Sequence, residues 1–252
     1  MNTIKLFSLA ALTIWTGIVP TCAQLAQSTF DSDADGWTVV DRTINTFQVI
    51  DTRPSDFHST GGNPGGFINI LDGAGDFYFR APAKFLGNKS AAYGYTLQFD
   101  LISDLAAAPT TLTYSVILIG GGSTNYASLP TIPAANTWTH FSVLLQAGAP
   151  WTNAATGLPA TAADLTNCLA SLQSLDIAGE FATGVDTGGI DNVILFGSGF
   201  TYNVSFDSGI FDPSFYLYGA TTMYIALPAT VSAQWELGER SSSTTSRIDW
   251  QK

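Results

Sequence analysis

Carboxylates at alternate positions near the N-terminus are the first residues in this sequence that could do chemistry. The segment FDSDADGW places Asp31, Asp33 and Asp35 before a glycine, which is how an EF-hand calcium loop begins. Position 12 of such a loop carries a bidentate glutamate, and here it is Arg42. The residues that follow alternate like a β-strand, whereas an EF-hand needs flanking helices. The segment is therefore not an EF-hand, although its oxygens could still bind a hard cation.

Catalytic side chains are scarce. His58 lies in a polar loop and is expected to be solvated, while the spacing around His140 predicts a position on the face of a strand. Cys168 sits in an apolar segment, which favours a buried, unreactive thiol. Glu180 lies between apolar residues, but no second carboxylate can be assigned to face it as a glycosidase requires. Since GxSxG and HExxH motifs are also absent, we predict that the protein is not an enzyme.

Aromatic side chains offer a different chemistry, because exposed rings can stack on sugars. The candidates are Trp138, Trp151 and Tyr126. Each could equally lie in a core, and alternation alone does not show which face of a strand is wet. For Trp138 we favour the core. Trp151 follows a proline in a predicted loop and is the better candidate for an exposed ring.

The charge balance excludes some partners. The 252 residues include 9 Lys and Arg against 20 Asp and Glu, for a formal net charge of −11. A surface with so few cations cannot neutralise phosphates, so nucleic acid is not an expected partner. No transmembrane span is expected either.

The N-terminus has the pattern of a secretory signal peptide. Lys5 precedes a short apolar stretch over residues 6–19, and small residues around Cys22 mark a cleavage site after Ala23. Residues 1–23 are therefore predicted to be a signal peptide, and the mature protein is expected to be secreted. Removal of Cys22 would leave Cys168 as the single cysteine, so no internal disulfide is possible.

These side chains must be positioned mainly by strands. Alternating apolar residues predict strands over 95–101, 112–119, 138–145 and 190–196, separated by glycine and proline clusters. A single helical pattern covers 162–175, with Thr161 as its cap and Asp164 in its first turn. Short strands with such turns are typical of an all-β sandwich or jelly roll with one short helix.

One segment resembles a known family. GGNPGGFI, FYFRAPAKFLGNKSAAYG and LQFDL, between residues 61 and 101, closely resemble the laminin IV domain, also called the laminin B domain. NTWTHFSVLL, PWTN, ATAADLTNCLASLQSLDIAGEF and IDNVIL follow in the order expected of that family. The resemblance covers residues 28–197. Residues 198–252 lie outside it and form a C-terminal extension that is expected to be partly disordered.

The resemblance implies a jelly-roll β-sandwich similar to carbohydrate-binding modules. The family is extracellular and known from matrix proteins, where it is inserted among cysteine-rich repeats. This chain has no such repeats and almost no cysteine, so only the module itself is expected to carry over.

The same likeness suggests a structural calcium. Many carbohydrate-binding jelly rolls hold one near the first strand, with an aspartate from the closing strand among its ligands. Asp33, Asp35 and Asp191 are the corresponding candidates, and their hard oxygens suit Ca²⁺. The alternative is a solvated acidic turn leading into Trp37, which is expected in the core, with Asp191 capping a backbone turn. No other cofactor is expected.

These observations favour a secreted, non-catalytic binding or adhesion module that recognises glycans or extracellular proteins. A purely structural component of a cell surface or matrix is the first alternative. An enzyme acting on glycosides is the least favoured.

Overall fold

The computed structural model describes residues 16–43, 46–72, 76–105, 108–109, 113–148 and 150–204. Nearly all of these belong to one compact unit, Ile18–Tyr202. Most of the predicted signal peptide, residues 1–15, and most of the predicted C-terminal extension, residues 205–252, lie outside the described residues. In the part that is described, no helix is long and apolar enough to cross a membrane.

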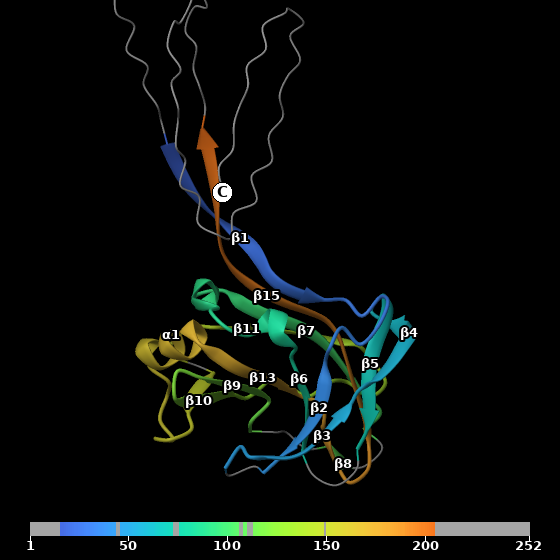
Figure 1. Cartoon of the computed structure of the whole chain (residues 1–252). Helices are drawn as coiled ribbons and strands as arrows, with labels where there is room; N and C mark the ends of the chain where they lie inside the picture. Colours follow the sequence, from blue (N-terminus) through green and yellow to red (C-terminus); the bar gives the residue numbers. More distant parts are fainter. Residues whose placement is uncertain are drawn as a thin grey trace, which may run out of the picture. The chain divides into compact units, whose positions relative to one another are not determined.

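One layer of the fold is a six-stranded sheet (Figure 1). Its strand order is β11 (Thr139–Leu144), β7 (Thr96–Ser103), β15 (Thr187–Val204), β5 (Gly65–Leu71) and β4 (Asp56–Gly62), and β1 (Thr16–Ser28) also pairs with β15. Neighbours along this path pair antiparallel. The long β15 is therefore the centre of the sheet, and its register shifts between Asp191 and Ile194.

The second layer is a seven-stranded sheet. It runs in the order β12 (Trp151–Asn153), β10 (Ser123–Ala127), β9 (Val116–Gly120), β13 (Leu172–Ala178), β6 (Phe77–Arg80), β2 (Thr38–Arg42) and β3 (Val49–Pro54). A small two-stranded sheet pairs β14 (Ala182–Thr183) with β8 (Ala108–Pro109). The helices are η1 (Ala83–Phe85), η2 (Ser90–Ala92) and α1 (Ala162–Ala170).

The core lies between the two sheets, because alternate side chains of both contribute to it. Phe99 and Leu101 of β7 pack in the same buried cluster as Phe79 of β6 and Ile177 of β13. Trp37 is buried there as predicted, and its ring packs edge-on against Phe85. The predicted all-β sandwich with one α-helix is confirmed, and strands β7, β9, β11 and β15 overlap the four predicted segments.

The helix is shorter than its sequence pattern suggested. Its start is confirmed, since Thr161 and Asp164 form a reciprocal capping box. It ends at Ala170, and the predicted last turn is instead the beginning of β13. Leu172 pairs with Gly120 of β9 and bridges Gly87, so its backbone is satisfied by sheet hydrogen bonds. Alternation in LQSLDIA, which is strand-like, outweighs the helical spacing of its leucines.

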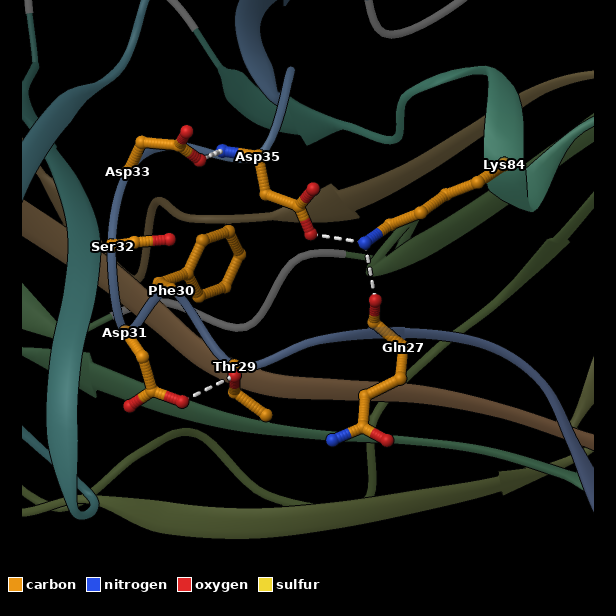
Figure 2. A pocket seen from close by; sticks show the side chains of 8 residues that line it. All are labelled: Gln27, Thr29, Phe30, Asp31, Ser32, Asp33, Asp35 and Lys84. Atoms are coloured by element: carbon orange, nitrogen blue, oxygen red, sulfur yellow. Dashed lines mark hydrogen bonds and ion pairs between the residues drawn. The ribbon is translucent and has the colours of Figure 1, made fainter.

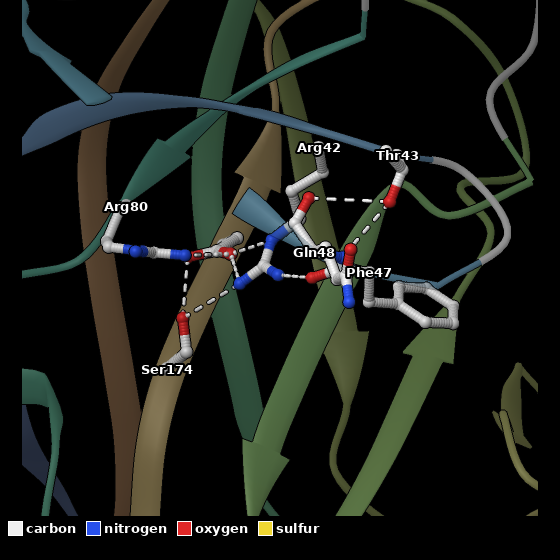
Figure 3. Close-up of polar contacts among 7 residues, drawn as sticks. Arg42, Thr43, Phe47, Gln48, Arg80 and Ser174 are labelled. Atoms are coloured by element: carbon white, nitrogen blue, oxygen red, sulfur yellow. Dashed lines mark hydrogen bonds and ion pairs between the residues drawn. The ribbon is translucent and has the colours of Figure 1, made fainter. Parts of the chain in front are cut away.

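A buried ion-pair network ties the seven-stranded sheet together (Figure 3). Asp176 on β13 is fully buried and forms ion pairs with both Arg42 and Arg80. The Arg42 Nε donates to Asp176 Oδ2 at 2.6 Å, and another Arg42 nitrogen donates to the Phe47 carbonyl. Ser174 Oγ donates to Asp176 Oδ1 at 2.9 Å. The arginine of the FYFRAPAKF segment is thus engaged in stabilising the fold.

Candidate functional site

The aspartates of FDSDADGW line a polar pocket of about 480 Å³ (Figure 2). The Asp33 side chain accepts a hydrogen bond from the Asp35 backbone N–H at 2.7 Å and so closes a turn. Asp35 forms an ion pair with Lys84, whose ammonium also donates to the carbonyl of Gln27 on β1. Asp35 therefore already has a cationic partner in the Lys84 ammonium.

Asp191, the third predicted calcium ligand, is fully buried on β15. Its Oδ2 accepts from the Asn63 N–H at 2.6 Å and its Oδ1 from the Asn192 N–H at 2.6 Å. Burial, with Asp100 and Asp31 nearby, raises the pKa of Asp191 to about 6. Within the described residues, no three His, Cys, Asp or Glu side chains form a group that could hold a metal ion. The three predicted ligands are therefore not gathered around one point.

Trp151 is not the exposed ring that its proline-containing loop suggested. Only 1% of the residue is exposed, and the indole N–H donates to the Leu144 carbonyl at 2.7 Å. The reason is that Trp151 begins β12, whose pairing with β10 places it opposite Ala127 with its ring in the core. It cannot stack on a ligand, and the prediction for this residue was wrong.

Tyr126 is half-buried on β10, in the seven-stranded sheet. Phe47 stacks on it, with ring centroids 5.8 Å apart and planes 27° apart. Tyr114 approaches it edge-on with centroids 4.6 Å apart. Other rings thus cover much of the Tyr126 side chain, which leaves it a weaker candidate for ligand stacking.

Trp138 lies just before β11 and is half-buried, where we had favoured a core position. Its indole N–H donates to the carbonyl of Gly61 on β4 at 2.9 Å. Its ring meets Phe67 edge-on, with centroids 5.4 Å apart. Phe67 in turn stacks on His58 at 4.8 Å, and the His58 Nε2 is 2.9 Å from Asn69 Oδ1. These contacts join three aromatic side chains into a row.

The row runs over the outer side of the six-stranded sheet. His58 is the cross-strand neighbour of Phe67, and the alternate residues Phe57 and Ile68 turn toward the core. A methyl group at Gly189 of β15 would lie 3.3 Å from the Phe67 ring and 2.9 Å from Ile102. Gly189 therefore lets the ring lie close to the sheet.

A polar cluster lies beside this row. His140 on β11 pairs across the strands with Asp100 on β7, and its Nδ1 is 2.7 Å from Asp100 Oδ1. The other Asp100 oxygen accepts from the side-chain amides of Asn63 at 3.2 Å and Asn192 at 2.9 Å. The His140 side chain is 58% exposed and that of Asp100 only 6%. The carboxylate thus orients an accessible imidazole and two amides.

We call this region the outer face of the six-stranded sheet. It comprises His58, Asn63, Phe67, Asn69, Asp100, Trp138, His140 and Asn192. Its groups can donate and accept hydrogen bonds and offer ring surface, which is the chemistry of a hydroxyl-rich ligand site. Alternation correctly suggested that His140 lies on a strand face. The spatial proximity of Asn63, Asp100 and Asn192 had no local signal, because it depends on which strands pair.

Glu180 faces several carboxylates that the sequence did not connect with it. It is 8% exposed, and its Oε2 accepts from the Phe77 N–H at 3.2 Å. Burial, followed by the charges of Asp72 and Asp76, raises its pKa to about 8. Asp186 is also buried, and burial raises its pKa. We call Asp72, Asp76, Glu180 and Asp186 the acidic end of the sandwich.

Cys168 conforms to its prediction. It is fully buried in α1, and burial raises the pKa of its thiol to about 11. A thiol that is both inaccessible and protonated at neutral pH is a poor nucleophile.

Comparison with known proteins places this architecture in a family. The family model described as "Laminin B (Domain IV)" matches residues 78–204, which is half of the chain and runs from β6 through β15. The human laminin subunit gamma-2 is 36% identical over 96 residues. That alignment covers 38% of this chain and 7% of the length of the laminin subunit.

A solved laminin domain shares the fold. The L4b domain of human laminin alpha-2 superposes with a TM-score of 0.55 at 15% identity, covering 69% of this chain and 98% of that domain. The CBM22-1 and GH10 modules of a Clostridium thermocellum xylanase give a TM-score of 0.41 at 16% identity, over 69% of this chain and 28% of that one. The family match over half of the chain, the sequence likeness to a laminin subunit and the shared fold of a laminin domain lead to one conclusion: the chain belongs to the laminin B (domain IV) family.

Proposed function

We propose that this protein is a secreted, non-catalytic module that binds a glycan on the outer face of the six-stranded sheet. The observation that carries the proposal is the row of Trp138, Phe67 and His58 beside the hydrogen-bonding cluster of His140 and Asn192. Sugar rings have apolar faces that pack on aromatic side chains and hydroxyl groups that need oriented donors and acceptors. Both requirements are met on one side of one sheet.

The family supports the non-catalytic part of the proposal, because laminin B domains are extracellular modules and not enzymes. The condition of the candidate catalytic groups is consistent with this. The Cys168 thiol and the Glu180 carboxyl are both buried. His140 is accessible, and its Nδ1 pairs with the carboxylate of Asp100. An imidazole and a carboxylate alone can orient a ligand hydroxyl without cleaving a bond.

Binding is expected to depend on Trp138. Trp138→Ala should weaken binding by roughly two- to tenfold, since it removes a ring contact worth about 0.5–1.5 kcal/mol and frees the Gly61 carbonyl to which the indole donates. The measurement is titration of glycan-array hits by calorimetry, with thermal melting of each variant to establish that it is folded.

Tyr126→Ala is the matched control, because it removes an aromatic ring from the other sheet. It should leave glycan affinity within about twofold of the wild type. If Tyr126→Ala abolishes binding and Trp138→Ala does not, the ligand lies on the seven-stranded sheet. If no glycan binds, the alternative of a purely structural matrix component is favoured.

Stabilisation by calcium stays a prediction. If Ca²⁺ binds among the predicted ligands, it must compete with the Lys84 ammonium for Asp35. The expected result is a rise in melting temperature on adding Ca²⁺, which Asp191→Ala abolishes, because a ligand that binds only the folded state stabilises it. An unchanged melting curve in excess chelator would contradict it.

Secretion through a cleaved signal peptide is also part of the proposal. Cleavage after Ala23 would fall within β1 and leave Gln24–Ser28 on the domain. This remaining part contributes Ala26 to the core and Ser28, whose hydroxyl accepts from the Trp37 indole at 2.8 Å. The contacts made by the retained part of β1 are therefore compatible with processing at that position.

A further inference from the structure

On the outer face of the six-stranded sheet, which is the proposed glycan face, the acidic side chains form no ion pair with a lysine or arginine of the described residues. Asp100 and Asp191 lie within it, and Asp56 is exposed on β4, where it pairs across the strands with Asn69. Asp31 is exposed at its margin, with one oxygen 2.6 Å from the position that a side chain on Gly65 would take. The two exposed carboxylates, Asp31 and Asp56, therefore flank a surface whose other groups are aromatic, imidazole or amide, while Asp100 and Asp191 are buried beneath it.

The lysines and arginines of the described residues have other partners where their contacts are known. Arg42 and Arg80 bind Asp176 on the seven-stranded sheet, and Arg53 on the same sheet binds Asp41. Lys84 binds Asp35 and the Gln27 carbonyl in the polar pocket that Asp31 also lines. Within the described ranges, no lysine or arginine forms an ion pair with Asp31, Asp56, Asp100 or Asp191.

The face also offers more than one ring. The centroids of the Trp138 and Phe67 rings are 5.4 Å apart, and those of the Phe67 and His58 rings are 4.8 Å apart. The Asp100 carboxylate beside this row holds His140 and Asn192. Three rings with polar groups beside them offer more surface than a single sugar ring can cover.

We infer that the ligand is an uncharged oligosaccharide of more than one sugar unit, and that sulfated or carboxylated chains are rejected. The inference rests on the proposed glycan function and narrows its ligand class. A sulfate beside Asp56 and Asp31 is repelled by their negative charges, whereas neutral hydroxyl groups are not, and this repulsion is screened by salt. Specificity of this kind comes from unfavourable contacts with the wrong ligand.

An array of matched pairs tests the inference. Hexasaccharides of β-1,4-linked glucose, xylose and N-acetylglucosamine are printed beside their sulfated counterparts and their monosaccharides. The expected result is that at least one neutral hexasaccharide binds, and that its sulfated counterpart and its monosaccharide each bind at least tenfold more weakly. Raising the salt concentration should reduce the difference in affinity between the neutral and the sulfated chain.

Charge variants locate the cause. The double variant Asp31→Asn with Asp56→Asn should reduce the ratio of the affinity for the neutral chain to that for the sulfated chain by at least threefold. The control Asp51→Asn removes an exposed carboxylate from β3 of the other sheet and should leave that ratio unchanged.

The outcomes separate the two proposals. Sulfated chains that bind as tightly as neutral ones, in a manner weakened by Trp138→Ala, would overturn the inference and leave the glycan function standing. Equal binding of monosaccharide and hexasaccharide would likewise overturn it. Absence of binding to every chain, or binding that Trp138→Ala does not weaken, would contradict the proposed function itself and the inference with it.

Discussion

Asp176→Asn is expected to lower the free energy of unfolding by about 3–5 kcal/mol, the usual cost of removing one partner of a buried ion pair. Asp176 is fully buried, and Arg42 beside it is nearly so. The isosteric amide leaves the Arg42 and Arg80 guanidinium groups side by side without the carboxylate that both contact. The two like charges, of Arg42 in the interior and of the partly exposed Arg80, repel each other and also lose their counter-ion.

The position of this network makes the effect large. Asp176 lies on β13 and pairs across the strands with Arg80 of β6 and with Ile117 of β9, while Arg42 is the last residue of β2. The ion pairs of Asp176 with Arg80 and Arg42 therefore link β13, β6 and β2, which are neighbours in the seven-stranded sheet. Loss of the carboxylate also affects the loop after β2, because Arg42 donates to the Phe47 carbonyl.

Urea unfolding followed by tryptophan fluorescence measures the change, with thermal melting as a second probe. A loss of this size corresponds to roughly 10 °C in melting temperature for a domain of this length. Asp51→Asn is the matched control, because Asp51 is a 62% exposed partner of Arg53 and an exposed pair contributes at most about 1 kcal/mol. If Asp176→Asn unfolds at the same urea concentration as the wild type, the network is not stabilising the fold.

Glu180→Gln is expected to stabilise the protein at alkaline pH. The pKa of Glu180 rises from its ordinary value of 4.5 to about 8 in the folded chain, mainly through burial and then through Asp72 and Asp76. The folded state thus holds a proton that the unfolded state releases. The contribution of this group to stability is fully present below about pH 4.5 and is lost as pH rises toward 8.

The amide removes that dependence while keeping an oxygen to accept from the Phe77 N–H. The rise from 4.5 to about 8 is about 3.5 pKa units, and each unit corresponds to about 1.4 kcal/mol, so the variant is expected to be up to about 5 kcal/mol more stable than the wild type at pH 8.5. Near pH 4.5 the two proteins should be almost equal. Melting temperatures across pH 4.5–9 measure the difference, which should reach roughly 5–15 °C at the alkaline end.

The acidic end supplies further checks on this result. Burial also raises the pKa values of Asp76 and Asp186, so the stability of the Glu180→Gln variant should itself fall as the pH rises. The comparison is therefore between variant and wild type at each pH, with Asp51→Asn as a substitution outside the cluster. A Glu180→Gln curve that runs parallel to the wild type at all pH values would show that Glu180 is ionised in the folded protein.

Local patterns in the sequence determined much of the fold. Alternating apolar residues located the strands, glycine and proline clusters located the turns, and Thr161 with Asp164 marked the start of α1. The string FYFRAPAKFLGN was enough to indicate the family. The exclusion of an EF-hand also followed from sequence alone, because Arg42 stands where the bidentate glutamate must be. All of these signals lie within a few residues of one another.

Tertiary structure decided the environment of individual side chains. Trp151 and Trp138 both stand at the start of a short strand, yet one ring enters the core and the other lies across a sheet face. The helical pattern after Ala170 gave way to β13 because a neighbouring strand was available to pair with it. Alternation identifies two faces of a strand, but only the packing of the second sheet determines which face is buried.

The same limit applies to the sites. Asp100, Asn63 and Asn192 are far apart in the sequence, and Asp72 is far from Glu180 and Asp186, yet the fold brings each set together. The sequence by itself determined that this is a β-sandwich of the laminin B family with few groups suited to catalysis. Only the tertiary structure decided which polar groups meet, because hydrogen bonds and charge interactions act over a few ångströms of space and are independent of separation along the chain.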